Sequence, residues 1–471
     1  MSPDAPFFFL GTPVANLVRL ASGYAANDPE NPLNWSLFRR LWVSAAIRYY
    51  TFAIYIGGGL ISPAYRDIEK SFDVNEETTV LTMSLFIFAY GFGALFFSPL
   101  SEIPRFGRNP WYWGPTIIVA GMQLGAALSP SFAGLAICRF LTGFFGSSII
   151  GGSGASFADI WGLRRLPIAL RLWSVPAFFA PGLGPIIVVS AVQRWGWRWS
   201  MWIHFFIICL ALLLLVFTVP ETSADSILYH RAARLRSRTG DSRYKARSEL
   251  KSASQSPRDI LYEALAMPFK ITLLDPSILF ASCYLAYCYG LFFTFFESYP
   301  IVFNEIFGFN PTTSSAGFVS VVVGTMISYP IYVAYQLFYM DPLIAKHGMP
   351  APEKRLEPAL ISCMTATVAL FIFECIFYYI IVLYEHNAAS VLAANDFMRS
   401  TLTALLIHAA TPLFRSRVGI HGGVSLLGGL AALGIVGAWW LYLKGGELRK
   451  KSRFAVSGAV GEPTVGVNEP R

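Results

Sequence analysis

Several charged side chains lie inside long apolar runs of the sequence, where they could bind or carry an ion: Arg48, Arg139, Glu297 and Glu374. An unpaired charge at the centre of a bilayer costs on the order of 3 kcal/mol or more, so such residues should face a bundle interior or a wet cavity. Burial away from water favours the protonated form of a carboxyl group. Glu297 could therefore take up and release a proton near neutral pH.

Three of these residues also have a structural interpretation, and the sequence assigns none to Glu374. Glu297 could lie close enough to the outer membrane surface to be solvated, Arg139 could anchor backbone carbonyl groups, and Arg48 could extend its guanidinium group to the interface. Aromatic residues surround Glu297 in the sequence, at Phe292, Phe293, Phe295, Phe296 and Tyr299. Such rings suit flat, lipophilic or cationic compounds, but in a chain that is 15% aromatic most rings pack against the core or lipid.

A second group of charged residues lies in the polar stretch SPLSEIPRFGRNP, residues 98–110, between two apolar runs. Its prolines restrict the backbone and Gly107 permits a close approach, as a tight turn between antiparallel helices requires. Glu102 and Arg108 could form bonds in one conformation that break in another, which is the property of a gate. The alternative is a solvated turn whose charges only set the orientation of the chain.

The elements that must position these residues are membrane helices. The 471 residues are 55% hydrophobic and 14% charged, with a mean hydropathy of +0.51, whereas about 25% of the residues in an average soluble domain are charged. A helix that spans a bilayer needs about 20 mostly apolar residues. Windows of this kind predict eleven spans, at 41–61, 79–100, 111–129, 133–155, 168–190, 199–219, 277–300, 314–340, 359–384, 390–413 and 422–443.

The distribution of Lys and Arg orients these helices, because basic loops stay in the cytoplasm. Basic residues occur in 98–110, at Arg164 and Arg165, and throughout 220–270. By contrast, 62–78 is acidic and 301–313 has no Lys or Arg. The two sets of loops are therefore expected on opposite sides of the membrane.

These patterns predict an all-α polytopic membrane protein built from two helical bundles. The expected order is a cytoplasmic N-terminal segment at 1–40, a six-helix bundle at 41–219, a basic cytoplasmic linker at 220–270, a second bundle at 271–443 and a cytoplasmic tail at 444–471. A basic linker could bind anionic lipid or nucleic acid. At this position it is expected to set topology, and no nucleic-acid partner is predicted.

Several motifs resemble the fungal multidrug drug:proton antiporters of the major facilitator superfamily. The polar turn resembles the loop between that superfamily's second and third helices, and its acid, Glu102, five residues before Gly107, matches the fungal spacing. RFLTGFFGSSIIGGSGASFADIW at 139–161 is similar to the fourth span, APGLGPIIVVS at 180–190 to the antiporter motif of the fifth, and FESYP around Glu297 to the seventh. Val188 and Val189 depart from the pair of glycines that the family has there.

The resemblance implies a twelve-span transporter with the major facilitator fold. Its expected activity is the export of lipophilic or cationic small molecules, drugs or toxic metabolites in exchange for protons by alternating access, as a monomer in the plasma membrane. The resemblance also implies roles for particular residues: proton and substrate coupling for Glu297 and Arg139, a cytoplasmic gate for Glu102, Gly107, Arg108, Asp159 and Arg164, and a cavity seal for Gly184 and Pro185.

The end of the chain conflicts with this pattern. Eleven spans would place the basic tail at 444–453 outside, against the positive-inside rule. Between PEKRLEPAL at 352–360 and YEHNAASVLAANDFMRS at 384–400 the family has two spans, whereas this chain has room for one. We therefore predict that the ninth and tenth helices are not both present at full length, which leaves a non-transporting sensor or an inactive paralogue as the alternative function.

Enzymatic activity is not expected from the sequence. It contains no His-rich metal cluster, nucleophile elbow or phosphate-cradling loop, and its scattered histidines include His204 and His408. The six cysteines lie in apolar stretches, which indicates neither a disulfide framework nor a zinc site. No cofactor or metal is predicted.

Overall fold

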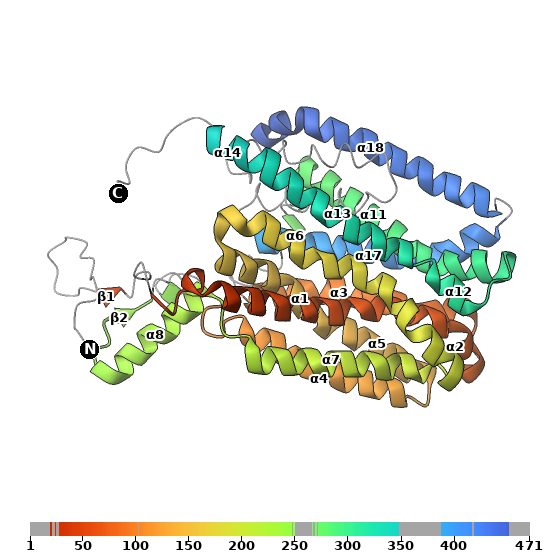
Figure 1. Ribbon diagram of the computed structural model, residues 1–471, viewed down its shortest axis with the longest axis horizontal. Helices are drawn as coiled ribbons and strands as arrows, with labels where there is room; N and C mark the ends of the chain where they lie inside the picture. Colours follow the sequence, from red (N-terminus) through yellow and green to blue (C-terminus); the bar gives the residue numbers. More distant parts are fainter. Residues whose placement is uncertain are drawn as a thin grey trace.

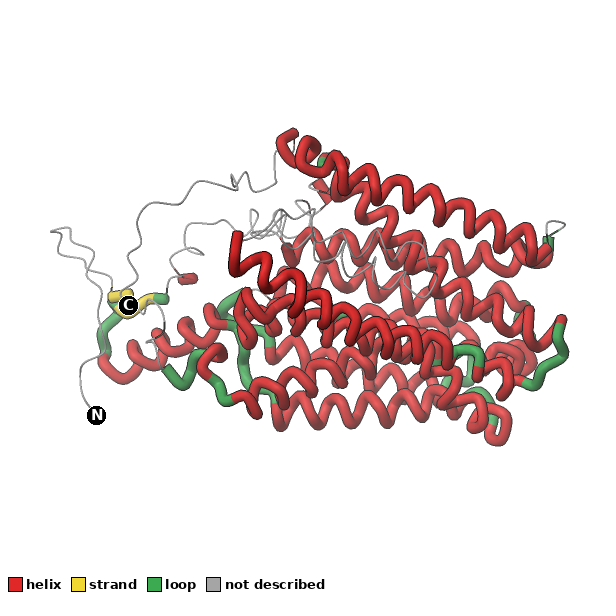
Figure 2. The backbone as a smooth tube through the Cα atoms, turned by 45° about the horizontal axis from the view of Figure 1, so that its top comes forward, coloured by secondary structure: helices red, strands yellow, loops and turns green. Residues whose placement is uncertain are grey.

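The computed structural model describes residues 19–20, 24, 28–101, 103–246, 248–249, 266, 269–270, 272–347, 388–416 and 419–451. Figure 1 shows a bundle of nearly parallel helices, with α8 (Ala224–Thr239) projecting from one end and α2 (Tyr65–Phe72) at the other. We name these the α8 end and the α2 end. Figure 2 shows that almost all of the described chain is helical and that its loops gather at the two ends.

The N half of the bundle comprises the helices before α8. In chain order they are η1 (Pro32–Asn34), α1 (Leu37–Gly59), η2 (Ser62–Ala64), α2, α3 (Glu76–Ser101), α4 (Asn109–Leu128), α5 (Phe132–Gly146), α6 (Ser148–Trp195) and α7 (Arg198–Thr218). Side-chain caps begin several of them: Asn31 accepts from Leu33 N at η1, Ser36 from Arg39 N at α1 and Ser131 from Gly134 N at α5.

Helix α6 contains two spans joined at a sharp break. Gly162 has φ 66° and ψ 166°, a conformation that no helix adopts and that favours glycine. The predicted span at 133–155 therefore consists of α5 and the first part of α6, and the predicted span at 168–190 lies in the part of α6 after Gly162.

The C half follows α8. It comprises α11 (Pro276–Tyr299), the π-helix η3 (Pro300–Ile306), α12 (Pro311–Ala316), α13 (Val319–Tyr335), the π-helix η4 (Gln336–Met340), α14 (Asp341–His347), α17 (Ala388–Arg415) and α18 (Gly419–Lys451). Two two-residue strands, β1 (Arg19–Leu20) and β2 (Tyr244–Lys245), pair in parallel beside α8 and are a small addition to the predicted all-α fold.

Six stretches of helix in the described residues are long and apolar enough to cross a membrane: Glu76–Ser101, Arg165–Trp195, Arg198–Thr218, Ile278–Ile306, Pro311–Lys346 and Ser425–Lys444. They coincide with six of the predicted windows. Helices α1, α4 and α17 lie at three of the others. The window at 359–384, and with it the prediction of an incomplete ninth and tenth span, lies outside the described residues.

The last helix bears on the orientation of the basic tail. Helix α17 runs towards the α2 end, and α18 returns from there towards the α8 end (Figure 1). Lys444, the first basic residue of the predicted tail, therefore lies on the part of α18 that approaches the end from which the basic helix α8 projects.

The two halves pack along several helix pairs, among them α3 with α17 and α6 with α13. Within the N half, α1 and α6 meet backbone to backbone. A Cβ on Gly59 would lie 2.1 Å from Pro181 O, and a Cβ on Gly184 would lie 2.8 Å from Leu60 N. The close contact thus occurs one helical turn before Val188, which is fully buried where the family has a glycine.

This contact predicts that Gly184→Ala lowers stability, because a methyl group there overpacks the α1–α6 contact at a cost of about 1–3 kcal/mol. Gly114→Ala in α4 is the matched control, since a Cβ at Gly114 has nothing within 4 Å. Both changes alter helix propensity equally. Thermal unfolding of the detergent-solubilised protein checks this, and equal melting temperatures for the two variants would contradict it.

Candidate functional site

A buried hydrogen bond joins the two halves near the α2 end. Tyr65 Oη donates to Glu297 Oε1 over 2.8 Å. Tyr65 is the first residue of α2 in the N half, and Glu297 lies near the end of α11 in the C half. Their exposed fractions are 8% and 4%. Glu297 is therefore not the solvated surface residue that the sequence left open, but a buried acid that contacts the opposite half.

A cavity of about 320 Å³ lies beside this hydrogen bond. Both halves contribute to its wall, which includes Tyr65, Arg66, Glu69, Glu76, Glu297, Tyr299, Glu305, Phe318 and Arg415. Its volume is at the lower limit of small-molecule sites, which span about 300–1,000 Å³. The carboxyl group of Glu297 can thus meet a proton or a solute that occupies the cavity.

Arg139 is fully buried in α5 and bonds mainly to backbone. Its Nε donates to Thr82 O over 2.9 Å and its Nη2 donates to Gly57 O over 2.7 Å. The guanidinium also lies 4.5 Å from the centre of the Phe86 ring. These contacts match the carbonyl anchor that the sequence offered as an alternative. Arg139 forms no ion pair with Glu297.

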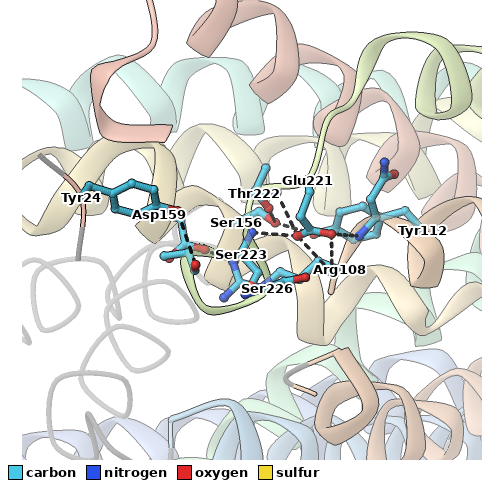
Figure 3. Close-up of polar contacts among 11 residues, drawn as sticks. Tyr24, Arg108, Tyr112, Ser156, Asp159, Glu221, Thr222, Ser223 and Ser226 are labelled. Carbon is cyan, nitrogen blue, oxygen red and sulfur yellow. Dashed lines mark hydrogen bonds and ion pairs between the residues drawn. The ribbon is translucent and has the colours of Figure 1, made fainter. Parts of the chain in front are cut away.

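At the α8 end the structure brings Arg108 and Asp159 together. The Arg108 Nη1 group donates to the Asp159 carboxylate, and the two form an ion pair (Figure 3). Arg108 immediately precedes α4, and Asp159 lies in the first part of α6 shortly before the break at Gly162. The pair ties the turn between α3 and α4 to α6, as a gate within the N half requires.

Glu221, to which the sequence assigned no role, holds the same turn. Its carboxylate accepts hydrogen bonds from Arg108 N at 3.0 Å and Asn109 N at 3.1 Å, at the start of α4. It also accepts from Thr222 N at 2.9 Å and Ser223 N at 2.7 Å, just before α8 (Figure 3). A carboxylate at two helix N-termini satisfies free amide groups and interacts favourably with both helix dipoles.

Gly107 makes room for this carboxylate. Its φ of 74° lies in the left-handed region that favours glycine, and a Cβ there would lie 2.2 Å from Glu221 Oε2. The motif glycine is therefore required by the shape of the turn and by Glu221. The role of Glu221 at a helix start could have been predicted from the sequence PETSADSILYH after α7, because an acid just before an N-cap serine stabilises the start of a helix.

Asp159 lies outside the apolar spans, and its environment favours proton uptake. Burial raises the pKa of Asp159 to about 6, while Arg108 opposes this shift. At neutral pH the carboxyl group is charged and pairs with Arg108. As the pH falls through about 6 the group takes up a proton, and the ion pair is lost.

The remaining predicted residues are placed as follows. Glu102 lies outside the described residues, as does the side chain of Arg164. Gly184 forms the α1–α6 contact described above, and Pro185 follows it within the second part of α6. None of these contacts the Tyr65–Glu297 bond directly in the described part of the chain.

Sequence reasoning missed a set of ion pairs at the α2 end, two of which join the halves. Arg415 at the end of α17 contacts Glu76 and Glu305, both over 3.1 Å. Arg66 in α2 lies 3.5 Å from Glu305. These residues are far apart in sequence, and nothing in the sequence distinguishes each one from an ordinary loop charge. Pairing across the halves carries no signal in a single sequence.

A buried ion pair in α17 was also missed. Asp396 and Arg399 approach to 2.5 Å, with exposed fractions of 1% and 3%. The Arg399 guanidinium lies 4.2 Å from the centre of the Tyr289 ring in α11. An acid and a base three positions apart lie on one helix face. The spacing of Asp396 and Arg399 in the window at 390–413 could therefore have predicted this ion pair.

Comparison with known sequences supports a transporter. The model of the Major Facilitator Superfamily matches residues 50–432. MFS-type transporter pyvG of Aspergillus violaceofuscus is 35% identical, over 92% of this chain and 84% of its own length. Multidrug transporter FLR1 of Candida glabrata is 33% identical over 91% and 82%, and Fluconazole resistance protein 1 of Saccharomyces cerevisiae is 30% identical over 91% and 83%.

Solved structures are similar in fold. The proton:xylose symporter XylE bound to 6-bromo-6-deoxy-D-glucose matches with a TM-score of 0.57 and 13% identity, over 87% of this chain and 97% of that chain. The peptide transporter POT in complex with sulfate matches with a TM-score of 0.57 and 10% identity, over 89% and 97%. At these identities the likeness concerns the fold alone.

The Arg108–Asp159 contact predicts energetic coupling that depends on pH. A double-mutant cycle with Arg108→Gln and Asp159→Asn should give an interaction energy of roughly 0.5–3 kcal/mol at pH 7.5. The energy should shrink at pH 5, because Asp159 is then protonated. Unfolding free energies of the solubilised protein measure it. The exposed pair Arg243–Asp241 is the control, where little coupling is expected; additive effects at pH 7.5 would contradict the prediction.

The Asp396–Arg399 pair predicts unequal effects of single and double changes. Asp396→Ala should cost about 3–5 kcal/mol, because it leaves a buried guanidinium without its counterion. Replacing both residues with apolar side chains, as Asp396→Leu with Arg399→Met, should recover most of this loss. Thermal unfolding compares the variants, and a double variant as unstable as Asp396→Ala would contradict the prediction.

Proposed function

This chain belongs to the Major Facilitator Superfamily, and we propose that it exports lipophilic or cationic small molecules in exchange for protons. Its family and its apolar helices make it an integral membrane transporter and not an enzyme, as the sequence predicts. The names of two relatives, a multidrug transporter and a fluconazole resistance protein, support export of small molecules. The same relatives favour transport over the alternative of a non-transporting sensor.

The observation that carries the proposal is the Tyr65–Glu297 hydrogen bond. A proton-coupled transporter needs a group whose protonation changes how its halves interact. Glu297 fits this description, because it is buried, lines a cavity and bonds to the opposite half. A hydrogen bond to an ionised acceptor is roughly twice as strong as one between neutral groups. Protonation of Glu297 therefore weakens the bond between the halves at the α2 end.

The contacts at both ends are formed in this structure, and alternating access would break them at one end at a time. At the α2 end, the Tyr65–Glu297 hydrogen bond and the Arg415–Glu76 ion pair join the halves. At the α8 end, Arg108, Asp159 and Glu221 fix the turn between α3 and α4. A change in the charge of Glu297 shifts the balance between states in which one end or the other is open. Arg139 contributes to this coupling as a positioning residue, because its bonds to Thr82 O and Gly57 O fix α3 and α1 around it.

The orientation follows from the basic residues. Helix α8 carries Arg231, Arg234, Arg236 and Arg238, and this composition favours a cytoplasmic α8 end. The cavity at the α2 end then opens towards the outside. We place the protein as a monomer in the plasma membrane, where export of toxic compounds protects the cell.

The proposal predicts that Glu297→Gln abolishes proton-driven efflux. Glutamine keeps an oxygen that accepts from Tyr65 but cannot take up a proton. Reconstituted vesicles with an imposed pH gradient and a panel of lipophilic compounds measure the rate, with Glu77→Gln, an exposed acid at the start of α3, as control. The Glu297→Gln rate should fall to that of wild type without a gradient. Full gradient-driven efflux in a folded Glu297→Gln protein would remove Glu297 from the mechanism.

A further inference from the structure

The polar contacts described above at the α8 end do not join the two halves. Arg108 and Asp159 both lie in the N half, and Glu221 ties the start of α4 to the start of α8. A different contact does join the halves, because Arg171 Nη2 of α6 donates to Ser328 Oγ of α13 over 2.7 Å. We propose that this hydrogen bond is a gate that must break before the α8 end opens. The inference rests on the proposed function and deepens it, because it assigns gating residues to alternating access.

The contact lies on the α8 side of the bundle. At about 1.5 Å per residue, Arg171 is about 14 Å along α6 from the break at Gly162, and α6 continues for about 36 Å beyond Arg171 to Trp195. At the other end of α6, near the α2 end, the hydroxyl group of Thr312 in α12 donates to Gln193 Oε1 over 3.1 Å. The bond of Arg171 is therefore the one of these two that lies nearer the α8 end.

Ser328 is oriented to accept from Arg171. Its own hydroxyl group donates to Thr325 O over 2.9 Å, one turn earlier in α13, so its lone pairs are left for the guanidinium. Arg171 is 2% exposed and Ser328 is 3% exposed. The guanidinium also lies 5.5 Å from the centre of the Tyr332 ring, within the range of a cation–π contact. One buried side chain of the N half thus contacts two side chains of the C half.

The charge of Arg171 links this contact to opening. A guanidinium group stays ionised in proteins, and inside a membrane it faces either a polar partner or a water-filled space. Ser328 is such a partner while α6 and α13 lie together, and water from the α8 end must replace it when they separate. Hydrogen bonds with a charged donor are stronger than those between neutral groups. The bond therefore stabilises the state in which the α8 end is closed.

Helix α13 contains features that permit this separation. Pro330 lies inside the helix, close after Ser328, and a proline removes a backbone hydrogen bond and bends a helix. The π-helix η4 follows α13 directly, and π-helical turns are frequent at functional sites. The part of α13 beyond Pro330 can therefore change its angle to α6 without unfolding of the whole helix.

A buried cysteine behind the contact tests the gate. Thr325 is 2% exposed and lies one turn nearer the α2 end than Ser328, on the same face of α13. In a protein whose native cysteines are replaced, a reagent from the α8 end reaches Thr325→Cys only after the halves separate at Arg171. By the proposed orientation, inside-out membrane vesicles present the α8 end to a membrane-impermeant maleimide. Its alkylation rate then follows the fraction of molecules that are open at this end.

In this background, Ser328→Ala should raise the alkylation rate about tenfold, because it removes a hydrogen bond to a charged group in the closed state. Ser328→Thr keeps the hydroxyl group and should react like the unmodified background. Ser320→Ala is the control, since Ser320 lies in the same helix but its hydroxyl group donates to Gly317 O of its own half. In an Arg171→Leu background, Ser328→Ala should cause no further change. Thermal unfolding checks that each variant is folded.

Four results would overturn the inference. An unchanged rate in Ser328→Ala would show that the bond does not hold the α8 end closed, and an equal rise in Ser320→Ala would indicate a general loosening of α13. The same rise from Ser328→Ala in the Arg171→Leu background would show that Arg171 is not the partner that matters. An equal rise in right-side-out vesicles, where the maleimide meets the α2 end, would show that the contact does not distinguish the two ends.

The efflux assay separates this inference from the proposed function. If wild type pumps no compound under a pH gradient but the alkylation rates change as expected, the export proposal fails and the gate stands. If wild type pumps and Ser328→Ala leaves the alkylation rate unchanged, the gate fails and the export proposal stands.

Discussion

The structure depends on one buried carboxyl group that the two halves of the bundle share. Glu297 lies in the C half and bonds to Tyr65 of the N half, with almost no exposure to water. An ionised carboxylate without partners in such a place is costly. A single bond from a phenol compensates only part of that cost, so the charge state of Glu297 and the contact between the halves must change together. Coupling between a proton and a conformation requires this linkage.

The remaining polar contacts are arranged around this constraint at the two ends of the bundle. At the α8 end, Glu221 joins the starts of α4 and α8, and Gly107 leaves the space for it. At the α2 end, the Arg415–Glu76 and Arg66–Glu305 ion pairs join the halves. The apolar helices between the ends pack closely, as at Gly59 and Gly184, and the proposed coupling requires them to transmit a change. Small shifts in one contact thus require the rearrangement of whole elements.

Much of the fold was predictable from the sequence, because a helix that crosses the hydrocarbon of a membrane needs a long run of apolar residues. The windows at 79–100 and 199–219 differ from α3 and α7 by a few residues at each end. Isolated charges inside other apolar runs were also visible in the sequence. Two of them, Arg139 and Glu297, are buried as membrane energetics requires. The break at Gly162 was not predicted, because the sequence does not distinguish a glycine with a positive φ from the many glycines inside helices.

Partners could not be predicted, because a single sequence does not tell which faces of distant helices meet. Nothing in the sequence distinguished Tyr65 from other loop residues, and only the structure shows its hydrogen bond to Glu297. In the same way, only the structure shows that Glu305 and Arg415 form an ion pair. Arg139 shows the same limit. Its burial was expected, but whether it bonds to an acid or to carbonyl groups depended on the position of Thr82 and Gly57.

The central claim is that the charge on Glu297 decides which end of the bundle is open. Distances between spin-label pairs, measured by double electron–electron resonance in nanodiscs, test it most directly. Lys70 and Asn310 would report on the α2 end, and Arg105 and Lys346 on the α8 end, since all four are exposed and each pair joins the two halves. At a pH high enough to ionise Glu297 in the wild type, Glu297→Gln should lengthen the first distance and shorten the second relative to wild type. Distances that do not change, or that change at only one end, would contradict the account.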